Sequence, residues 1–227
     1  MDENKVAVIT GTSSGLGLAM ATSLLERGFL VFGGSRTESS IDHENYIDVE
    51  LDVRDEKSVK DFYRVIADET EVVDLLINNA GICEMNSFKE TTSTEFLDHI
   101  ETNLIGSFYL YKYFEPFIIS EETSIFNIQS ISAKHTYPNT SSYTAGEFGK
   151  RGLIESILKE WSRYKIRRAN FYVGAIQTPL WDKYDDLEVD KMLTTEDFIY
   201  MFDCILDSPS HIQFPEITFI HRDGFID

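Results

Sequence analysis

The chain has 227 residues, of which 42% are hydrophobic, so it is long enough to bury a full core, and we expect a single domain over residues 1–227. Lysine and arginine number 20 against 39 aspartate and glutamate residues, which leaves a formal net charge of −19 at pH 7. A chain this acidic is poorly suited to bind nucleic acid or anionic lipid. We therefore expect neither as a partner.

The cysteines indicate whether disulfides or a metal site are expected, and the N-terminal residues indicate whether the chain is directed to a membrane or for secretion. Cys83 and Cys204 are too few for a disulfide framework and too far apart in sequence to suggest a metal site. The apolar run at residues 6–9 ends within a few residues at a glycine, so it is too short for a signal peptide or a membrane span. We expect a reduced, cytoplasmic protein without a metal and without membrane association.

Short apolar runs alternate with helical patterns along the chain. The apolar runs predict seven strands, at residues 6–10, 29–33, 46–51, 72–78, 124–129, 169–173 and 217–220. Helical periodicity predicts helices at residues 15–27, 56–69, 93–119, 141–164 and 195–206. This alternation indicates a doubly wound α/β fold with a mostly parallel, seven-stranded sheet of Rossmann type. The acidic, irregular stretch at residues 180–193 is a candidate substrate lid.

The connection between the first expected strand and helix is rich in glycine and hydroxyl residues: Gly11, Ser13, Ser14, Gly15, Leu16 and Gly17. A strand, a glycine turn and a helix point free backbone N–H groups and the positive end of a helix dipole at one spot, where a pyrophosphate can bind. We expect Gly11 to permit the turn, Gly15 to let the phosphate approach, and Gly17 to remove a side chain between helix and sheet. A purely structural turn is the alternative.

Further motifs follow in order along the chain: Asp52-Val53 after the third strand, Asn-Asn-Ala-Gly at residues 78–81, Asn103 in the long helix, Ser130, Tyr143 thirteen residues later, and the turn at residues 173–179. With the glycine loop, they make the chain resemble the short-chain dehydrogenase/reductase family over nearly its whole length. One mild departure is Val173, where the family usually has proline.

The resemblance implies hydride transfer between a nicotinamide and a carbonyl or alcohol carbon of a small molecule. It implies cofactor contacts from the glycine-loop residues named above and from Asp52, Val53, Asn79, Ala80, Gly81, Tyr143, Gly174 and Thr178. Ser130 would orient the carbonyl and Tyr143 would donate a proton to it. Asn103 would hold a water or a local helix kink. Apart from the family resemblance, Ser130 at the end of a strand and Asn103 in a helix would have no functional role.

Glu147 is the main departure from the family, which has lysine four residues after the tyrosine. A residue four positions on lies on the same helix face, so a carboxylate there should raise the pKa of the Tyr143 phenol above its usual value near 10. Carbonyl reduction needs the neutral phenol and would survive, whereas alcohol oxidation needs the phenolate. The carboxylate can also accept hydrogen bonds from ribose hydroxyls. Lys150 lies about 10 Å further along the helix, and we expect it not to reach Tyr143.

The end of the second strand bears on the choice of nicotinamide cofactor. Position 35 is Ser35, where an acid would hold the ribose 2′-hydroxyl of NAD, and Arg36 follows it. An arginine there can pair with the 2′-phosphate of NADP. The sequence therefore favours NADP over NAD, although an exposed loop cation is the alternative role for Arg36.

Three functions compete at this point. The first is an NADP-linked reductase of small carbonyl substrates. The second is a catalytically weak or inactive nucleotide-binding sensor or interaction protein, because Glu147 replaces the family lysine. The third, a methyltransferase on a related α/β fold, would make the spacing of Ser130 and Tyr143 a coincidence.

Assembly and substrate choice rest on other segments. The helices at residues 93–119 and 141–164 carry more apolar and aromatic side chains than one sheet face needs, and family members pair through the equivalent helices. We therefore expect a homodimer or a homotetramer. Residues 135–140 and 180–193 should shape the substrate site, with Trp181 and Tyr184 suited to an apolar or flat ligand.

Overall fold

In the computed structural model, which describes residues 4–120, 123–184 and 187–224, seven strands form one sheet in the order β3-β2-β1-β4-β5-β6-β7, and every pair is parallel. The strands are β1 (Val6–Thr10), β2 (Leu30–Ser35), β3 (Tyr46–Glu50), β4 (Leu75–Asn78), β5 (Ser124–Ser130), β6 (Arg167–Val173) and β7 (Phe214–Phe219). The expected doubly wound fold is confirmed. All five residues of β1 are buried, as an apolar run without alternation requires in a sheet covered on both faces.

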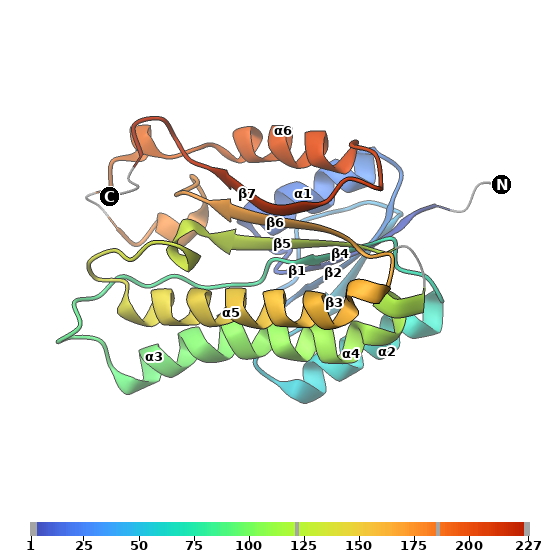
Figure 1. Cartoon of the computed structure of the whole chain (residues 1–227), viewed down its shortest axis with the longest axis horizontal. Helices are drawn as coiled ribbons and strands as arrows, with labels where there is room; N and C mark the ends of the chain where they lie inside the picture. The colour runs from blue at the N-terminus through green and yellow to red at the C-terminus, as the bar shows by residue number, and fades with distance from the viewer. Residues whose placement is uncertain (1–3, 121–122, 185–186, 225–227) are drawn as a thin grey trace.

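Helices cover both faces of the sheet. They are α1 (Gly15–Glu26), α2 (Glu56–Glu69), α3 (Ser93–His99), α4 (Gly106–Ser120), α5 (Ser141–Glu160) and α6 (Thr195–Leu206). Figure 1 shows α1 and α6 on one face and α2, α4 and α5 on the other. Each layer buries its own apolar core, with Met20 and Phe202 in the first and Phe62, Phe114 and Ile154 in the second. Within the described part of the chain, no helix has both the length and the apolar character to cross a bilayer.

The segment at residues 93–119, expected as one α-helix, is divided. A π-helical turn, η1 (Ile100–Ile105), separates α3 from α4. Inside this turn the Asn103 side chain binds the backbone of Ile82 twice, with Oδ1 accepting from its N–H at 2.9 Å and Nδ2 donating to its carbonyl at 3.0 Å. The regular α-helical geometry thus gives way to a tertiary contact, because the π turn changes the direction in which the Asn103 side chain points.

Several expected boundaries also shift: β4 begins at Leu75 rather than at residue 72, β2 ends at Ser35 rather than at residue 33, and β6 begins at Arg167 rather than at residue 169. The helix predicted at residues 141–164 ends as α5 at Glu160, and a single 3-10 turn, η3 (Trp161–Arg163), follows it. The last strand begins at Phe214, three residues before the predicted residue 217, although Pro215 lies within it. Because β7 is the last strand of the sheet, the nitrogen of Pro215, which has no hydrogen to donate, can face the side where no neighbouring strand lies, and proline is tolerated on such an edge.

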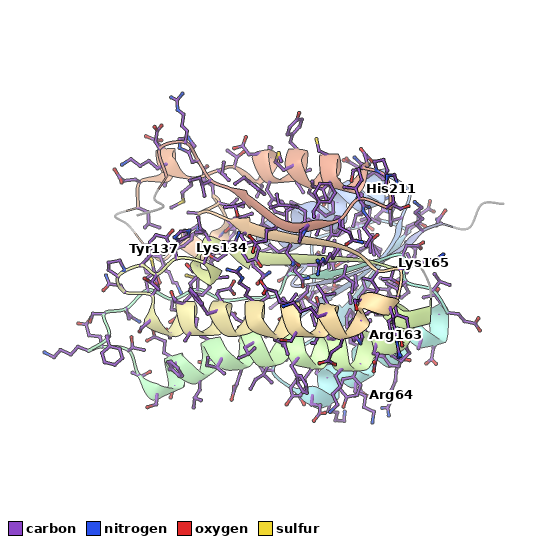
Figure 2. The ribbon with its side chains drawn as sticks, viewed as in Figure 1. Arg64, Lys134, Tyr137, Arg163, Lys165 and His211 are labelled. Carbon is purple, nitrogen blue, oxygen red and sulfur yellow. The ribbon has the colours of Figure 1, made fainter. Side chains whose placement is uncertain are left out.

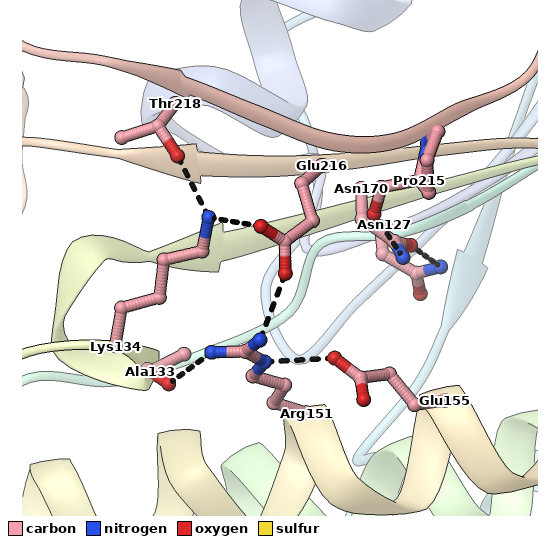
Figure 3. A network of polar contacts seen from close by, with 9 residues as sticks. All are labelled: Asn127, Ala133, Lys134, Arg151, Glu155, Asn170, Pro215, Glu216 and Thr218. Carbon is pink, nitrogen blue, oxygen red and sulfur yellow. Dashed lines mark hydrogen bonds and ion pairs between the residues drawn. The ribbon is translucent and has the colours of Figure 1, made fainter.

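Three asparagines lie side by side across the sheet, where Asn78 pairs with Asn127 and Asn127 pairs with Asn170. The amide of Asn78 donates to Asn127 at 3.3 Å. Asn127 donates to Asn170 at 2.9 Å, and Asn170 donates to the Pro215 carbonyl at 3.0 Å (Figure 3). The buried Tyr111 hydroxyl also donates to Asn127. Because a slip of one residue would leave these buried groups unpaired, the row favours a single strand register.

Charged side chains of α5 and of the connection that precedes it form ion pairs with the edge strand β7. Figure 3 shows the Lys134 ammonium donating to Glu216 and Thr218, both at 2.9 Å. The other oxygen of Glu216 accepts from Arg151 at 2.8 Å, and Arg151 also pairs with Glu155 on its own helix. A strand edge with these charges beside it is protected against pairing with a second chain.

We predict that Asn127→Ala lowers the free energy of unfolding by about 2–5 kcal/mol, because it leaves the buried polar groups of Asn78, Tyr111 and Asn170 without their shared partner. Urea denaturation followed by circular dichroism measures this loss. The control Asn86→Ala removes an exposed amide and should change stability by less than about 0.5 kcal/mol. A loss at Asn127 as small as the control would contradict the structural importance of the row.

Candidate functional site

A cavity of about 1010 Å³ opens where the carboxyl ends of the parallel strands meet. Ligands of open α/β sheets bind at this edge. Every residue that the sequence predicts for a cofactor or catalytic role lines this cavity: Gly11, Ser13, Ser14, Gly15, Leu16, Gly17, Arg36, Asp52, Val53, Asn79, Ala80, Gly81, Asn103, Ser130, Tyr143, Glu147, Gly174 and Thr178. The fold thus gathers them at one place, and their roles there stay predictions.

The glycine loop has the geometry of a phosphate-binding turn. Gly11 and Gly15 have φ angles of 79° and 55°, in the left-handed region that favours glycine. Ser14 precedes α1 in an extended conformation and its side chain makes no capping hydrogen bond, so the helix N-terminus keeps donors for a ligand. A Cβ on Gly17 would lie 1.9 Å from the Gly11 carbonyl oxygen, so Gly17 makes room for the loop backbone rather than for the sheet.

The turn after β4 is tied to the end of β1. The backbone N–H groups of Asn79 and Ala80 both donate to the Thr10 hydroxyl at 3.0 Å, and the Asn79 amide donates to the Thr10 carbonyl at 2.8 Å. These contacts hold the glycine loop and the Asn-Asn-Ala-Gly turn in a fixed relation, so the turn has a structural task in addition to any cofactor contact.

The cavity end near β2 and β3 carries the charges relevant to cofactor choice. Arg54 pairs with Asp52 at 2.7 Å, and this hydrogen-bonded arginine lowers the pKa of the Asp52 carboxyl. Arg36 is exposed, and within the described residues it makes no hydrogen bond or ion pair. Three acids line a small hollow beside Arg36: Glu38, Asp48 and Glu50.

Beyond Asn127 the strand β5 has no partner on the β4 side, because β4 ends at Asn78. Two side chains of α5 bind backbone groups of this continuing stretch. Glu147 accepts from the Ser130 N–H at 2.9 Å, and the Lys150 ammonium donates to the Ile128 carbonyl at 2.9 Å. Both side chains are deeply buried, with 3% of Glu147 and 1% of Lys150 exposed. Glu147 therefore holds the backbone of Ser130, a role that the sequence did not reveal.

The electrostatics of Tyr143 follow from this arrangement. Burial raises the pKa of the Tyr143 phenol well above its ordinary value, the Glu147 charge raises it further, and a hydrogen bond with Ser130 opposes the shift. The predicted effect of Glu147 is confirmed in direction, while burial is the larger cause. The Ser130 hydroxyl oxygen accepts from the Ser132 N–H at 3.0 Å, so its one proton can be donated to the Tyr143 oxygen or to a carbonyl oxygen placed beside it.

Lys150 and Cys83 lie close to this pair without replacing the family lysine. Burial lowers the pKa of Lys150, and the Glu147 carboxylate opposes that shift. The Lys150 ammonium donates to the Ile128 carbonyl. Burial raises the pKa of the Cys83 thiol to about 12, so Cys83 stays a neutral thiol.

The candidate lid touches the segment that follows β4. The Tyr184 hydroxyl accepts from the Met85 N–H at 2.7 Å, and Lys183 pairs with Glu84 at 2.9 Å. The Trp181 indole donates to the Ile176 carbonyl at 2.9 Å. Residues 185 and 186 of the expected lid lie outside the described residues.

The cavity continues past Tyr143 between four segments of the chain. The expected segments at residues 135–140 and 180–193 both contribute, the first with Tyr137 and the second with Trp181, and Figure 2 labels Tyr137 near Lys134 in the connection from β5 to α5. The segments at residues 82–85 and 220–224 were not predicted. Residues that follow a parallel strand emerge at the carboxyl edge of the sheet, so their position after β4 and β7 was the signal available. Among the described residues, no three histidine, cysteine or acidic side chains are grouped to hold a metal ion.

The sequence profile of the family described as short chain dehydrogenase matches residues 5–188. The chain is 34% identical to the uncharacterized oxidoreductase YxbG of Bacillus subtilis over 191 residues, covering 80% of this chain and 70% of that protein. It is 29% identical to a 3-amino-tetrahydro-pyrrolizinone reductase of Xenorhabdus hominickii over 184 residues, which span 79% of this chain and 64% of that reductase.

The fold also matches a solved structure, an alcohol dehydrogenase from the archaeon Thermococcus sibiricus complexed with 5-hydroxy-NADP. The TM-score is 0.89 and the identity 23%, with 99% of this chain and 100% of that chain covered. At this identity the likeness concerns the fold. The profile match and the Bacillus relative together show that the chain belongs to the short-chain dehydrogenase/reductase family of NAD(P)-dependent oxidoreductases.

Proposed function

We propose that the protein is an NADP-linked reductase of small carbonyl compounds, in which Ser130 and Tyr143 act on the carbonyl oxygen. The observation that carries the proposal is that both hydroxyl residues line the same cavity as the glycine loop. A cofactor whose pyrophosphate binds at the loop would extend along this cavity toward the pair.

The chain's own residues can stabilise and protonate the oxygen that becomes negative during reduction. The bound nicotinamide supplies the hydride to the carbonyl carbon. With a carbonyl compound bound, the Ser130 hydroxyl would donate a hydrogen bond to the carbonyl oxygen, and the neutral Tyr143 phenol would transfer its proton to that oxygen as the alcohol forms. Glu147 holds Ser130 in place through the backbone N–H.

The direction of the reaction follows from the state of Tyr143. Because its pKa lies well above the ordinary value, the phenol is neutral at physiological pH and can serve as an acid. Oxidation of an alcohol would need the phenolate as a base. We therefore propose reduction as the favoured direction.

NADP is the cofactor that we propose, with NAD as the alternative. Arg36 is exposed at the cavity wall and can pair with a 2′-phosphate, and the similar Thermococcus enzyme was solved with an NADP derivative. The acids Glu38, Asp48 and Glu50 beside Arg36 weaken the local positive potential, so we expect a preference for NADP rather than strict specificity. Glu147 could accept hydrogen bonds from the nicotinamide ribose in place of the family lysine.

A cofactor-binding protein without turnover is the second candidate. Its support is the buried carboxylate of Glu147 at the position where the family has lysine. For this candidate the cavity would still bind the dinucleotide, and the protein would act as a sensor or an interaction partner.

We also propose a single domain with residues 180–193 as its lid, and assembly into a homodimer or homotetramer through the helices that follow β4 and β5. The support for assembly is that apolar side chains of α3, α4 and α5 are exposed: Phe96, Leu97, Phe108 and Phe148. Exposed apolar groups of this size on neighbouring helices favour contact with another protein surface.

We predict that a panel of uncharged aldehydes and ketones is reduced with NADPH, more slowly with NADH, and that Tyr143→Phe lowers kcat at least about 100-fold, since the proton donor is lost. The decrease of absorbance at 340 nm measures the rate, and fluorescence titration with NADPH checks that the variant still binds cofactor. A protein that binds NADPH and reduces none of the panel would contradict the reductase and favour the sensor.

We predict that Glu147→Gln moves the alkaline limb of the pH profile to lower pH by up to about 2 units, from about 3 kcal/mol for a unit charge at roughly 6 Å and an effective dielectric near 20. The sign follows because removing a negative charge lowers the pKa of Tyr143, so reduction falls and oxidation rises at lower pH than in the wild type. Glutamine keeps an oxygen for the Ser130 N–H. The control Glu155→Gln removes the same charge elsewhere on α5, beside Arg151, and should leave the profile in place. Identical profiles for all three proteins would show that Glu147 does not act on the phenol.

A further inference from the structure

The part of the cavity beyond Tyr143 is walled by apolar side chains from separate segments. Ile82 and Met85 come from the stretch after β4, Pro138 from the connection into α5, and Trp181 and Met192 from the two ends of the candidate lid region. Walls of this kind stabilise ligands that lose apolar surface to water on binding.

A negative charge lies at the reacting end of this space. The Glu147 carboxylate is almost fully buried, and its charge acts on the Tyr143 phenol. The neighbouring Lys150 ammonium donates to the Ile128 carbonyl and partly offsets the Glu147 charge. A substrate carbonyl within hydrogen-bond reach of Tyr143 would therefore lie in the same cavity as a buried carboxylate.

Of the lysines near the substrate part of the cavity, Lys150 donates to the Ile128 carbonyl, and two others have carboxylate partners. Lys191 pairs with Glu188 at 2.8 Å, and Lys183 pairs with Glu84 at 2.9 Å. The remaining arginines of the cavity wall, Arg36 and Arg54, lie with Asp52 at the end near β2 and β3, where the cofactor phosphates are proposed to bind. Within the described residues, this distribution offers an anionic substrate group no cation that is not already paired or committed.

From these walls and charges we infer the substrate class: uncharged, hydrophobic ketones and aldehydes, with rejection of carbonyl compounds that carry a carboxylate or phosphate next to the reacting carbon. A carboxylate there would lie close to Glu147 in a space that excludes water, where like charges repel strongly. The inference rests on the proposed reductase function for the position of the carbonyl, and its test measures binding separately from turnover.

A matched pair of ligands tests the inference. Ethyl benzoylformate and benzoylformate share the same aryl ketone, and only the second carries a negative charge at pH 7. Calorimetry with the protein saturated with NADP⁺ measures binding alone, because the oxidised cofactor has no hydride to deliver. We expect the ester to bind at least about 30-fold more tightly than the acid. Equal or tighter binding of the acid, or no binding of the ester, would overturn the substrate class.

Variants separate charge from size. Glu147→Gln should lower the ratio of the ester's binding affinity to the acid's about tenfold. The matched change Glu155→Gln on the same helix should leave this affinity ratio unchanged. A ratio that Glu147→Gln does not move would overturn the role given to this carboxylate. Turnover of the same pair with NADPH distinguishes the two proposals: an ester that binds without being reduced contradicts the reductase, and an acid reduced as well as the ester contradicts the substrate class alone.

Discussion

The unequal lengths of two neighbouring strands underlie the whole site. β4 ends at Asn78, while β5 continues to Ser130 without a partner on that side. Backbone groups exposed by the missing strand need hydrogen bonds, and Glu147 and Lys150 supply them from α5. The same gap opens the sheet edge into a cavity, so the residues that satisfy the strand are also the residues that face a ligand.

This constraint explains how a carboxylate can occupy a position where the family has lysine. A lysine could not accept from the Ser130 N–H, whereas Glu147 does so with good geometry. Its charge is partly offset by Lys150, whose pKa is lowered by burial and raised by the Glu147 carboxylate. The cost falls on Tyr143, whose phenol is harder to ionise, and this favours proton donation over proton abstraction.

Much of the fold could be predicted because local patterns and tertiary packing agree. The strand at residues 6–10 and the helix at residues 56–69 have the boundaries that their apolar spacing indicated. The prediction was wrong where a contact between residues distant in sequence outweighs the local helical preference. Asn103 is the example, because its hydrogen bonds to Ile82 accompany a π turn inside an otherwise α-helical stretch. The start of β7 was missed because Pro215 argues against a strand unless that strand is known to lie at an edge.

The sequence by itself determined the class of fold, the glycine loop and the presence of an acid at position 147, because these depend on residue type and on spacing along one strand or helix, and its resemblance to the family implied the Ser130 and Tyr143 pair. Only the tertiary structure decided that Glu147 binds the Ser130 backbone, that Lys150 is directed to Ile128, and that residues 82–85 and 220–224 complete the cavity. Those facts depend on where one strand ends relative to its neighbour and on segments far apart in the chain, and periodicity along a chain carries no information about either.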